Sequence, residues 1–310
     1  MKNQLKTVQA LLRDLEMQHR QNGKWSTASL YATVSNAITD FTHGQALNFD
    51  AFSPGLLKDF ENHLRAKNHS WNTVSTYMRI LRTAYKQAVV LNYASFQPYI
   101  FNKVYTGVVA DRENALDIRE MERLTKVCMD KGNELTPSQQ QALQYFVLMF
   151  MLRGLPFVDL AYLKRNELKG HKISYRRRKT GRPLTIELTK PMMKLMKGLV
   201  NHDVSSPYLF PLLHYPDGSV EAHKEYQAQL KSFNNRLRSV GKVLKVDLNL
   251  TSYAARHTWV TIAFICGINP AVISQSVGHS SIEVTETYLK PFRQKAINDA
   301  NRKVLQRILK

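Results

Sequence analysis

Three residues in the C-terminal part of the chain have types and spacing that suit chemistry on a phosphate. Tyr288 follows His279 by nine residues, and Arg256 lies upstream of both. A phenol can act as a nucleophile that forms a covalent intermediate, while an arginine and a histidine can stabilise charge on phosphate oxygens. The 310 residues include 44 Lys and Arg against 24 Asp and Glu, a net charge of +20 that favours a nucleic-acid partner. Together these features predict attack of a phenol on a phosphodiester.

A second basic region lies between residues 164 and 182, where nine Lys and Arg residues accompany one acid. An ammonium on a mobile turn can donate a proton to a DNA strand, so Lys179 is the candidate general acid and Lys172 its main rival. Guanidinium groups hold two phosphate oxygens at once and keep their charge. The neighbouring candidates for DNA contact are Arg176, Arg177 and Arg178, with a solvated basic loop as the alternative.

Residues 1–105 are expected to be all-helical and to form one domain. The longest helix predicted there spans residues 74–91, with apolar residues on one side and basic residues on the others. Its basic residues are candidate DNA contacts, with an ordinary solvated helix face as the alternative: Arg79, Arg82 and Lys86. Phosphate contacts position a protein without reading bases, so these residues do not identify a DNA sequence.

The helical periodicity stops after residue 105. Residues 106–111 are expected to be a linker, and residues 112–310 a second domain. Residues 171–175 and 183–188 alternate like two short strands, and helical patterns fill most of the remainder. The expected fold class is therefore mainly α with a small β-sheet. The helices predicted in this domain span residues 118–129, 138–152, 155–163, 190–199, 221–243, 252–266, 270–277 and 293–309, and another carries Tyr288.

The segments Arg256-His-Thr and Gly278-His-Ser-Ser, with Tyr288 downstream, resemble the tyrosine recombinase (phage integrase) family over about residues 115–292. This resemblance implies a helical, SAM-like core-binding domain followed by a catalytic domain. It implies that Tyr288 forms a 3′-phosphotyrosyl link, that Arg256 and His279 bind the attacked phosphate, and that Lys179 protonates the leaving 5′-oxygen. It also implies that rejoining needs no ATP, metal or other cofactor.

Two positions depart from the family pattern. Where the first catalytic arginine is usual, Pro156 stands instead, and Arg153 lies three residues earlier. One helical turn would keep Arg153 on roughly the same face, so we expect it to fill that role, with Asp159 orienting an arginine. Tyr253 occupies the usual histidine position, where a phenol is a poor base near neutral pH; we place it among the DNA contacts.

The resemblance also implies partners. A recombinase of this class acts as a homotetramer on two double-stranded DNA sites, and an accessory DNA-bending protein is an expected helper. The signatures Arg153-Gly-Leu-Pro and Tyr253-Ala-Ala-Arg resemble the Bacteroidetes branch of mobile-element integrases and DNA invertases. Two rivals stay open: a type IB topoisomerase, which shares the chemistry, and a catalytically dead DNA-binding remnant.

The cysteine usage indicates a cytosolic protein, and the resemblance implies a bacterial cytoplasmic one at the nucleoid. The two cysteines, Cys128 and Cys266, lie in apolar helical contexts and are expected to be buried, reduced thiols. No His and Cys cluster has zinc-ligand spacing, so a structural metal is not expected. No run of about 18 apolar residues exists to span a membrane.

Overall fold

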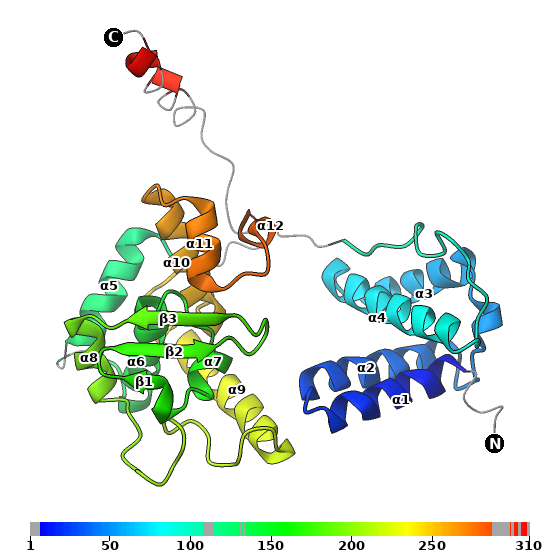
Figure 1. Ribbon diagram of the computed structural model, residues 1–310, viewed down its shortest axis with the longest axis horizontal. Coiled ribbons are helices and arrows are strands. Elements are labelled where there is room, and N and C mark those ends of the chain that lie inside the picture. The colour runs from blue at the N-terminus through cyan, green and yellow to red at the C-terminus, as the bar shows by residue number, and fades with distance from the viewer. Residues whose placement is uncertain are drawn as a thin grey trace. The chain divides into compact units, whose positions relative to one another are not determined.

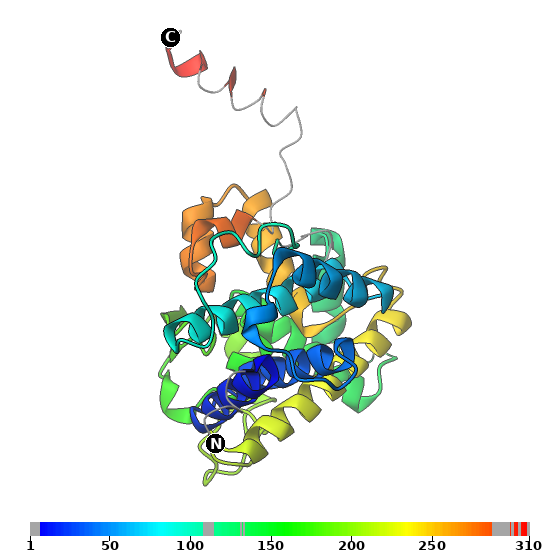
Figure 2. The ribbon, with the colours of Figure 1, turned by 90° about the vertical axis from the view of Figure 1, so that its right-hand side faces the viewer.

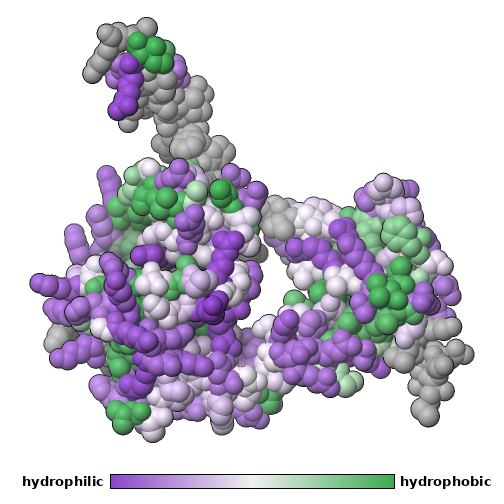
Figure 3. Space-filling model, viewed as in Figure 1, coloured by the Kyte–Doolittle hydropathy of each residue, from purple (hydrophilic) through white to green (hydrophobic). Residues whose placement is uncertain are grey.

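The computed structural model of the protein describes residues 7–107, 115–130, 132, 134–286, 298, 301–302 and 305–308. The chain divides into two compact units, Met1–Asp111 with Gly218–Val220, and Arg112–Asp217 with Glu221–Lys310. We call them the N-terminal unit and, after the predicted catalytic residues that its range includes, the catalytic unit. Hydrophilic side chains cover most of the visible face of each unit, with smaller apolar areas between them (Figure 3).

The N-terminal unit is built from four helices around one apolar core. They are α1 (Val8–Gln21), α2 (Trp25–Phe41), α3 (Pro54–Ala66) and α4 (Trp71–Val90). Side-chain caps begin three of them, because Thr7, Ser53 and Ser70 each accept a hydrogen bond from a backbone N–H of the first turn. Helices α1 and α2 lie side by side (Figures 1 and 2). The packed residues include Leu12, Val34, Phe60, Met78 and Leu81.

The catalytic unit is mainly helical. Its helices are α5 (Ile118–Met129), α6 (Pro137–Met151), α7 (Phe157–Ala161), α8 (Lys190–Lys197), α9 (Val220–Val243), α10 (Ser252–Ile265), α11 (Pro270–Val277) and α12 (Ile282–Glu286). Helix α6 lies in the middle of the core, with seven of its fifteen residues buried. It packs against α5, α8 and α10. A segment apolar on nearly every side can be satisfied only in such a central place.

A three-stranded antiparallel sheet interrupts the helices, in the order β1-β2-β3. The strands are β1 (Leu168–Lys169), β2 (Lys172–Arg176) and β3 (Pro183–Glu187). In β2, Ile173 and Tyr175 are buried while their neighbours are exposed, which is the alternation expected of a strand with one face on a core. The predicted fold class, mainly α with a small sheet, is confirmed; β1 was not predicted.

The two cysteines differ in their surroundings. Cys128 is buried, and burial raises the pKa of its thiol to about 12. Cys266 is exposed, so the prediction that it is buried is wrong. It is the C-cap of α10 and precedes Gly267, whose left-handed φ of +79° turns the chain out of the helix. Within the described residues, no helix has the length and apolar character needed to cross a membrane.

Candidate active site

Arg256 is the most deeply buried cation among the described residues of the catalytic unit. It lies on α10, and only 2% of its surface is exposed. Its Nη1 donates to the carbonyl oxygen of Gly154 at 3.2 Å, and its Nη2 donates to that of Val277 at 2.6 Å. The two acceptors come from segments more than a hundred residues apart. The guanidinium is therefore held in one orientation by the backbone of both.

The turn that contains Gly154 packs directly on α10. A Cβ atom at Gly154 would lie 2.7 Å from Cα of Arg256, and its φ is +67°. Both facts require glycine at this position, because a side chain would clash and the left-handed conformation disfavours one. Arg153, the preceding residue, also has a left-handed φ, of +58°.

Arg153 does not lie on a helix, so the helical-turn reason for its predicted role is wrong. It lies in the turn between α6, which ends at Met151, and α7, which begins at Phe157. Pro156 is the N-cap of α7, in extended conformation. In the part of the chain that the structure describes, the Arg153 guanidinium has no hydrogen bond or ion pair. The turn itself, through Gly154, brings Arg153 close to Arg256.

The β2–β3 turn presents Lys179. The turn is closed by Arg177 N–H donating to the carbonyl of Arg182 at 2.9 Å, and by Gly181 N–H donating to that of Arg177 at 2.7 Å. Lys179 lies in this turn and is exposed. Its rival, Lys172, lies on β2 and pairs with Glu187 of β3 at 3.0 Å. A strand lysine with a cross-strand carboxylate partner is the less free of the two to donate a proton to a substrate.

His279 lies just after α11 and is 2% exposed. Gly278 ends the helix with a φ of +66°, and the His279 N–H donates to the carbonyl of Ser274 at 3.0 Å. Nδ1 lies 2.8 Å from the hydroxyl oxygen of Thr285. Burial lowers the pKa of His279 to about 3, and the nearby charges of Arg256, Arg177, Lys179 and Arg182 lower it too. The imidazole is therefore neutral near pH 7.

Asp159 of α7 is buried and contacts the β2–β3 turn. Its Oδ1 accepts a hydrogen bond from the Arg178 N–H at 2.9 Å, and its Oδ2 lies 3.7 Å from Nε of Arg177. Burial raises the pKa of Asp159, while the N–H of Arg178 and the charges of Arg177, Arg256 and Arg178 oppose that rise. The arginine side chain that pairs with it is that of Arg177, which the sequence did not single out for such a role.

The three consecutive arginines of the turn differ sharply. Arg177 is 7% exposed and its Nη1 donates to the carbonyl of Gly278 at 2.7 Å. Arg178 makes two hydrogen bonds to Asp217, at 3.0 and 2.9 Å, and its guanidinium lies 3.8 Å from the ring centroid of Tyr162. Arg176 is exposed and donates to the carbonyl of Gly181 at 3.1 Å. These three adjacent arginines thus comprise one buried cation and two exposed ones.

Of the two tyrosines singled out from the sequence, the structure describes only Tyr253. Tyr253 is 51% exposed on α10, and its ring lies edge-on to His257 with centroids 4.5 Å apart. Burial, and then the charge of Arg256, lowers the pKa of His257 to about 4. Tyr288 lies outside the described residues, as does most of the predicted final helix. The described part of α12 ends at Glu286.

In the N-terminal unit, the candidate DNA contacts of α4 are only partly available. Arg79 and Lys86 are exposed. Arg82 is half-buried, donates from Nη2 to the Thr106 hydroxyl at 3.1 Å, and lies 5.4 Å over the ring of Phe101. Arg82 therefore holds the segment after α4 in place, a role that the helical periodicity did not indicate.

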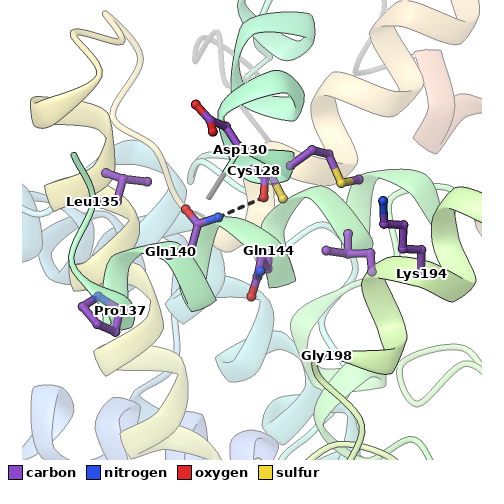
Figure 4. Close-up of a pocket in the computed structure, with 10 residues that line it drawn as sticks. Cys128, Asp130, Leu135, Pro137, Gln140, Gln144, Lys194 and Gly198 are labelled. Atoms are coloured by element: carbon purple, nitrogen blue, oxygen red, sulfur yellow. Dashed lines mark hydrogen bonds between the residues drawn. The ribbon is translucent and has the colours of Figure 1, made fainter. Parts of the chain in front are cut away.

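A cavity of about 400 Å³ lies elsewhere in the catalytic unit, between the end of α5, the start of α6 and α8 (Figure 4). The Gln140 amide crosses it to donate to the carbonyl of Cys128 at 2.9 Å. None of the residues singled out for phosphate chemistry lines it. We therefore set it apart from the site of Arg256 and His279.

Comparison with known proteins bears on both units. Residues 7–104 match the phage integrase SAM-like domain, and residues 114–295 match the phage integrase family. Tyrosine recombinase XerA of Pyrococcus furiosus is 26% identical over 172 residues, which span 54% of this chain and 56% of that protein. XerA of Pyrococcus horikoshii is 22% identical over 263 residues, 76% of this chain and 88% of that protein.

Solved structures show the same fold. A Tn1549 transposon integrase in complex with a circular intermediate DNA superposes with a TM-score of 0.67 at 17% identity, covering 96% of this chain and 99% of that one. The family match over residues 114–295 covers more than half of the 310 residues. This chain therefore belongs to the phage integrase family of tyrosine recombinases.

Proposed function

We propose that this protein is a site-specific DNA recombinase that cleaves and rejoins DNA through a 3′-phosphotyrosyl intermediate. One observation carries the proposal. Arg256 and Arg177 donate to the carbonyls of Val277 and Gly278, which are the two residues before His279. Lys179 lies two residues beyond Arg177, in the same turn. Two candidate phosphate ligands, Arg256 and His279, and the candidate acid Lys179 are thus brought to one loop.

In the proposed step, the Tyr288 oxygen attacks phosphorus and the bond from phosphorus to O5′ breaks. The phenolic proton leaves to water, and Lys179 gives a proton to O5′, which becomes a free hydroxyl. The phosphate is then bonded to Tyr288 on the 3′ side. Attack of a 5′-hydroxyl reverses each of these transfers and reseals a strand, so the bond energy is kept and no cofactor is consumed.

The surrounding groups stabilise the pentacoordinate state. Arg256 supplies permanent positive charge from a fixed position, which avoids reorganisation when charge develops on the phosphate oxygens. His279 acts as a neutral hydrogen-bond donor. Thr285 can donate its hydroxyl hydrogen to Nδ1, and this arrangement puts the ring proton on Nε2. Arg153 adds a second guanidinium from the turn that contacts Arg256.

The DNA partner is inferred from the net positive charge of the chain and from its family. Residues 1–105 would serve as core-binding domain and 112–310 as catalytic domain, joined by 106–111, with Arg79, Lys86 and Arg176 as phosphate contacts. The related Tn1549 integrase is bound to DNA in its structure. We infer a homotetramer on two DNA sites in the bacterial cytoplasm at the nucleoid, with an accessory DNA-bending protein. The Arg153-Gly-Leu-Pro signature supports a place in the Bacteroidetes mobile-element branch, in DNA integration or inversion.

The test is covalent capture on a suicide DNA substrate whose cleaved strand cannot rejoin. Wild-type protein should give a protease-sensitive adduct, and Tyr288→Phe should give none while binding the same DNA. Tyr215, an exposed tyrosine of the same unit, provides the control, because Tyr215→Phe should leave the adduct unchanged. An adduct formed by Tyr288→Phe would remove Tyr288 from the nucleophile's role.

The same preparation separates the two rival functions. A type IB topoisomerase would relax supercoiled plasmid that lacks a recombination site, whereas a recombinase needs paired sites to yield recombinant product. A DNA-binding remnant would bind but give no adduct with any substrate.

A further inference from the structure

We propose that Arg177 is a positioning residue, which fixes the turn bearing Lys179 against the loop bearing His279. The proposal rests on the proposed function, because it concerns the proton that Lys179 gives to the leaving oxygen. It assigns to Arg177 a role different from a direct DNA contact.

Burial is the first argument. Only 7% of Arg177 is exposed, although it stands between Arg176 and Arg178, both of which are exposed. Burying a guanidinium carries a large desolvation cost unless charge and hydrogen bonds offset it. Burial alone does not separate a positioning role from a phosphate contact, since Arg256 is buried as well; the partners of the Arg177 side chain carry the distinction.

The partners of the Arg177 side chain come from two other segments. Nη1 donates to the carbonyl of Gly278 at 2.7 Å, next to His279. Nε lies 3.7 Å from the Asp159 carboxylate of α7. The fit around this contact is close, because a Cβ at Gly278 would lie 3.2 Å from Cδ of Arg177. Arg177 therefore joins α7, the turn and the histidine loop at one point.

The rest of the turn repeats the attachment on both sides of Lys179. The Arg178 N–H donates to Asp159 at 2.9 Å. The hydroxyl of Thr180 donates to the same Gly278 carbonyl at 3.4 Å, and Nη2 of Arg182 donates to the carbonyl of Ser280 at 2.7 Å. Lys179 itself is exposed. Its backbone is thus held on both sides while its side chain stays free to reach a substrate.

Such an anchor matters because proton transfer depends on placement. A misplacement of about 1 Å can slow a reaction roughly 10²-fold. If Arg177 acts through Lys179, its loss should matter only when the leaving group needs a proton. If Arg177 instead holds the phosphate, its loss should slow cleavage of any leaving group.

The experiment compares two suicide substrates, one with the natural 5′-oxygen and one with sulfur at that bridging position. A thiol has a pKa near about 8.5 and leaves as a thiolate without a general acid. We expect Lys179→Ala and Arg177→Met to cleave the oxygen substrate slowly, Arg177→Met by about 10²-fold, and both to cleave the sulfur substrate at nearly the wild-type rate. Arg177→Lys should be intermediate.

A matched control is Arg123→Met. Arg123 also donates to a backbone carbonyl, that of Leu244 at 2.7 Å, but on α5; its loss should change neither substrate's rate. Thr180→Val keeps the charge and removes only the second donor to Gly278. Thr180→Val should cleave the oxygen substrate more slowly than wild type, by a smaller factor than Arg177→Met, and should cleave the sulfur substrate at nearly the wild-type rate. If Arg177→Met does not fold, Thr180→Val provides the test.

Equal slowing of Arg177→Met, or of Thr180→Val, on both substrates would overturn the assignment. Failure of sulfur to restore Lys179→Ala would overturn it as well, since Lys179 would not be the proton donor. Failure of the proposed function looks different, because wild-type protein would then form no adduct with either substrate.

Discussion

The basic residues of the catalytic unit and those of α4 are held in opposite ways. Arg256 and Arg177 are almost fully buried, and each donates to backbone carbonyls of distant segments. Arg79 and Lys86 project from α4 into solvent, and Arg79 donates at most to a carbonyl of its own helix, at 3.4 Å. A buried guanidinium acts from one point, whereas an exposed one adds charge without a fixed aim. Chemistry needs the first arrangement, and sequence-independent DNA binding is served by the second.

The largest effect should come from removing Arg256, the most deeply buried cation among the described residues of the catalytic unit. Arg256→Ala should slow single-turnover cleavage by about 10²-fold or more, equal to roughly 3 kcal/mol of transition-state stabilisation. The reason is that the carbonyls of Gly154 and Val277 hold its guanidinium at one point. Measuring the rate at saturating protein separates this loss from weaker binding. A rate within about threefold of wild type would mean that Arg256 does not touch the phosphate.

Arg153 is a half-buried arginine in a left-handed turn, and within the described residues its guanidinium has no hydrogen bond or ion pair. Its substitution tests whether such a cation contributes to cleavage as the buried Arg256 is expected to. Its φ of +58° allows a clean deletion, because glycine adopts this conformation without strain. Arg153→Gly should fold normally and still lose roughly 10-fold to 100-fold in cleavage, if its charge meets the phosphate.

Lys245 is the matched control for Arg153. It is a basic residue of the catalytic unit with a left-handed φ of +49°, and Lys245→Gly should cleave at the wild-type rate. Wild-type cleavage by Arg153→Gly as well would leave the first-arginine role to another basic residue of the Arg176–Arg182 turn.

The same contrast separates what the sequence could predict from what it could not. Helix α5 has the predicted bounds, Ile118–Met129, because local signals define it: Asp117 caps it and Glu120 completes a capping box. Strands β2 and β3 lie within one residue of prediction, since alternation is also local. The position of Arg153 could not be predicted this way, because its left-handed turn is set by the approach of Gly154 to Arg256, a hundred residues away.

The buried state of Arg177 was equally out of reach. Arg176, Arg177 and Arg178 are identical in type and adjacent, and the strand alternation places only one of them inward. A signal was present in that alternation, since Ile173, Tyr175 and Arg177 share the inward parity of β2. The sequence analysis treated the arginines as a charge run and did not follow the alternation past the strand.

A smaller effect is expected at α4. Arg79→Ala and Lys86→Ala should each weaken DNA binding about equally for all sequences. Each should also make the slope of log K against log salt shallower by roughly 0.9, one phosphate contact. The control is Lys67→Ala, because Lys67 on the same unit pairs with Asp40 and should leave the slope unchanged. An unchanged salt slope for Arg79→Ala would mean that this face of α4 is exposed to solvent and does not contact DNA.

The last effect concerns the pH dependence of stability, which should also differ between the two units. The pKa values of His279 and His257 are lowered to about 3 and about 4, chiefly by burial. Well above pH 6.5 neither the folded nor the unfolded histidine holds a proton. As the pH falls below 6.5, the unfolded chain takes up protons that the folded unit cannot, so stability is lost until the folded pKa values are reached. Each histidine contributes at most about 1.4 kcal/mol per pH unit.

Hydrogen exchange of α10 should therefore quicken between pH 6.5 and 5, after correction for intrinsic rates, more than that of α4. His257→Gln should remove about half of this dependence, and equal pH dependence in α10 and α4 would contradict the burial of both imidazoles as neutral groups.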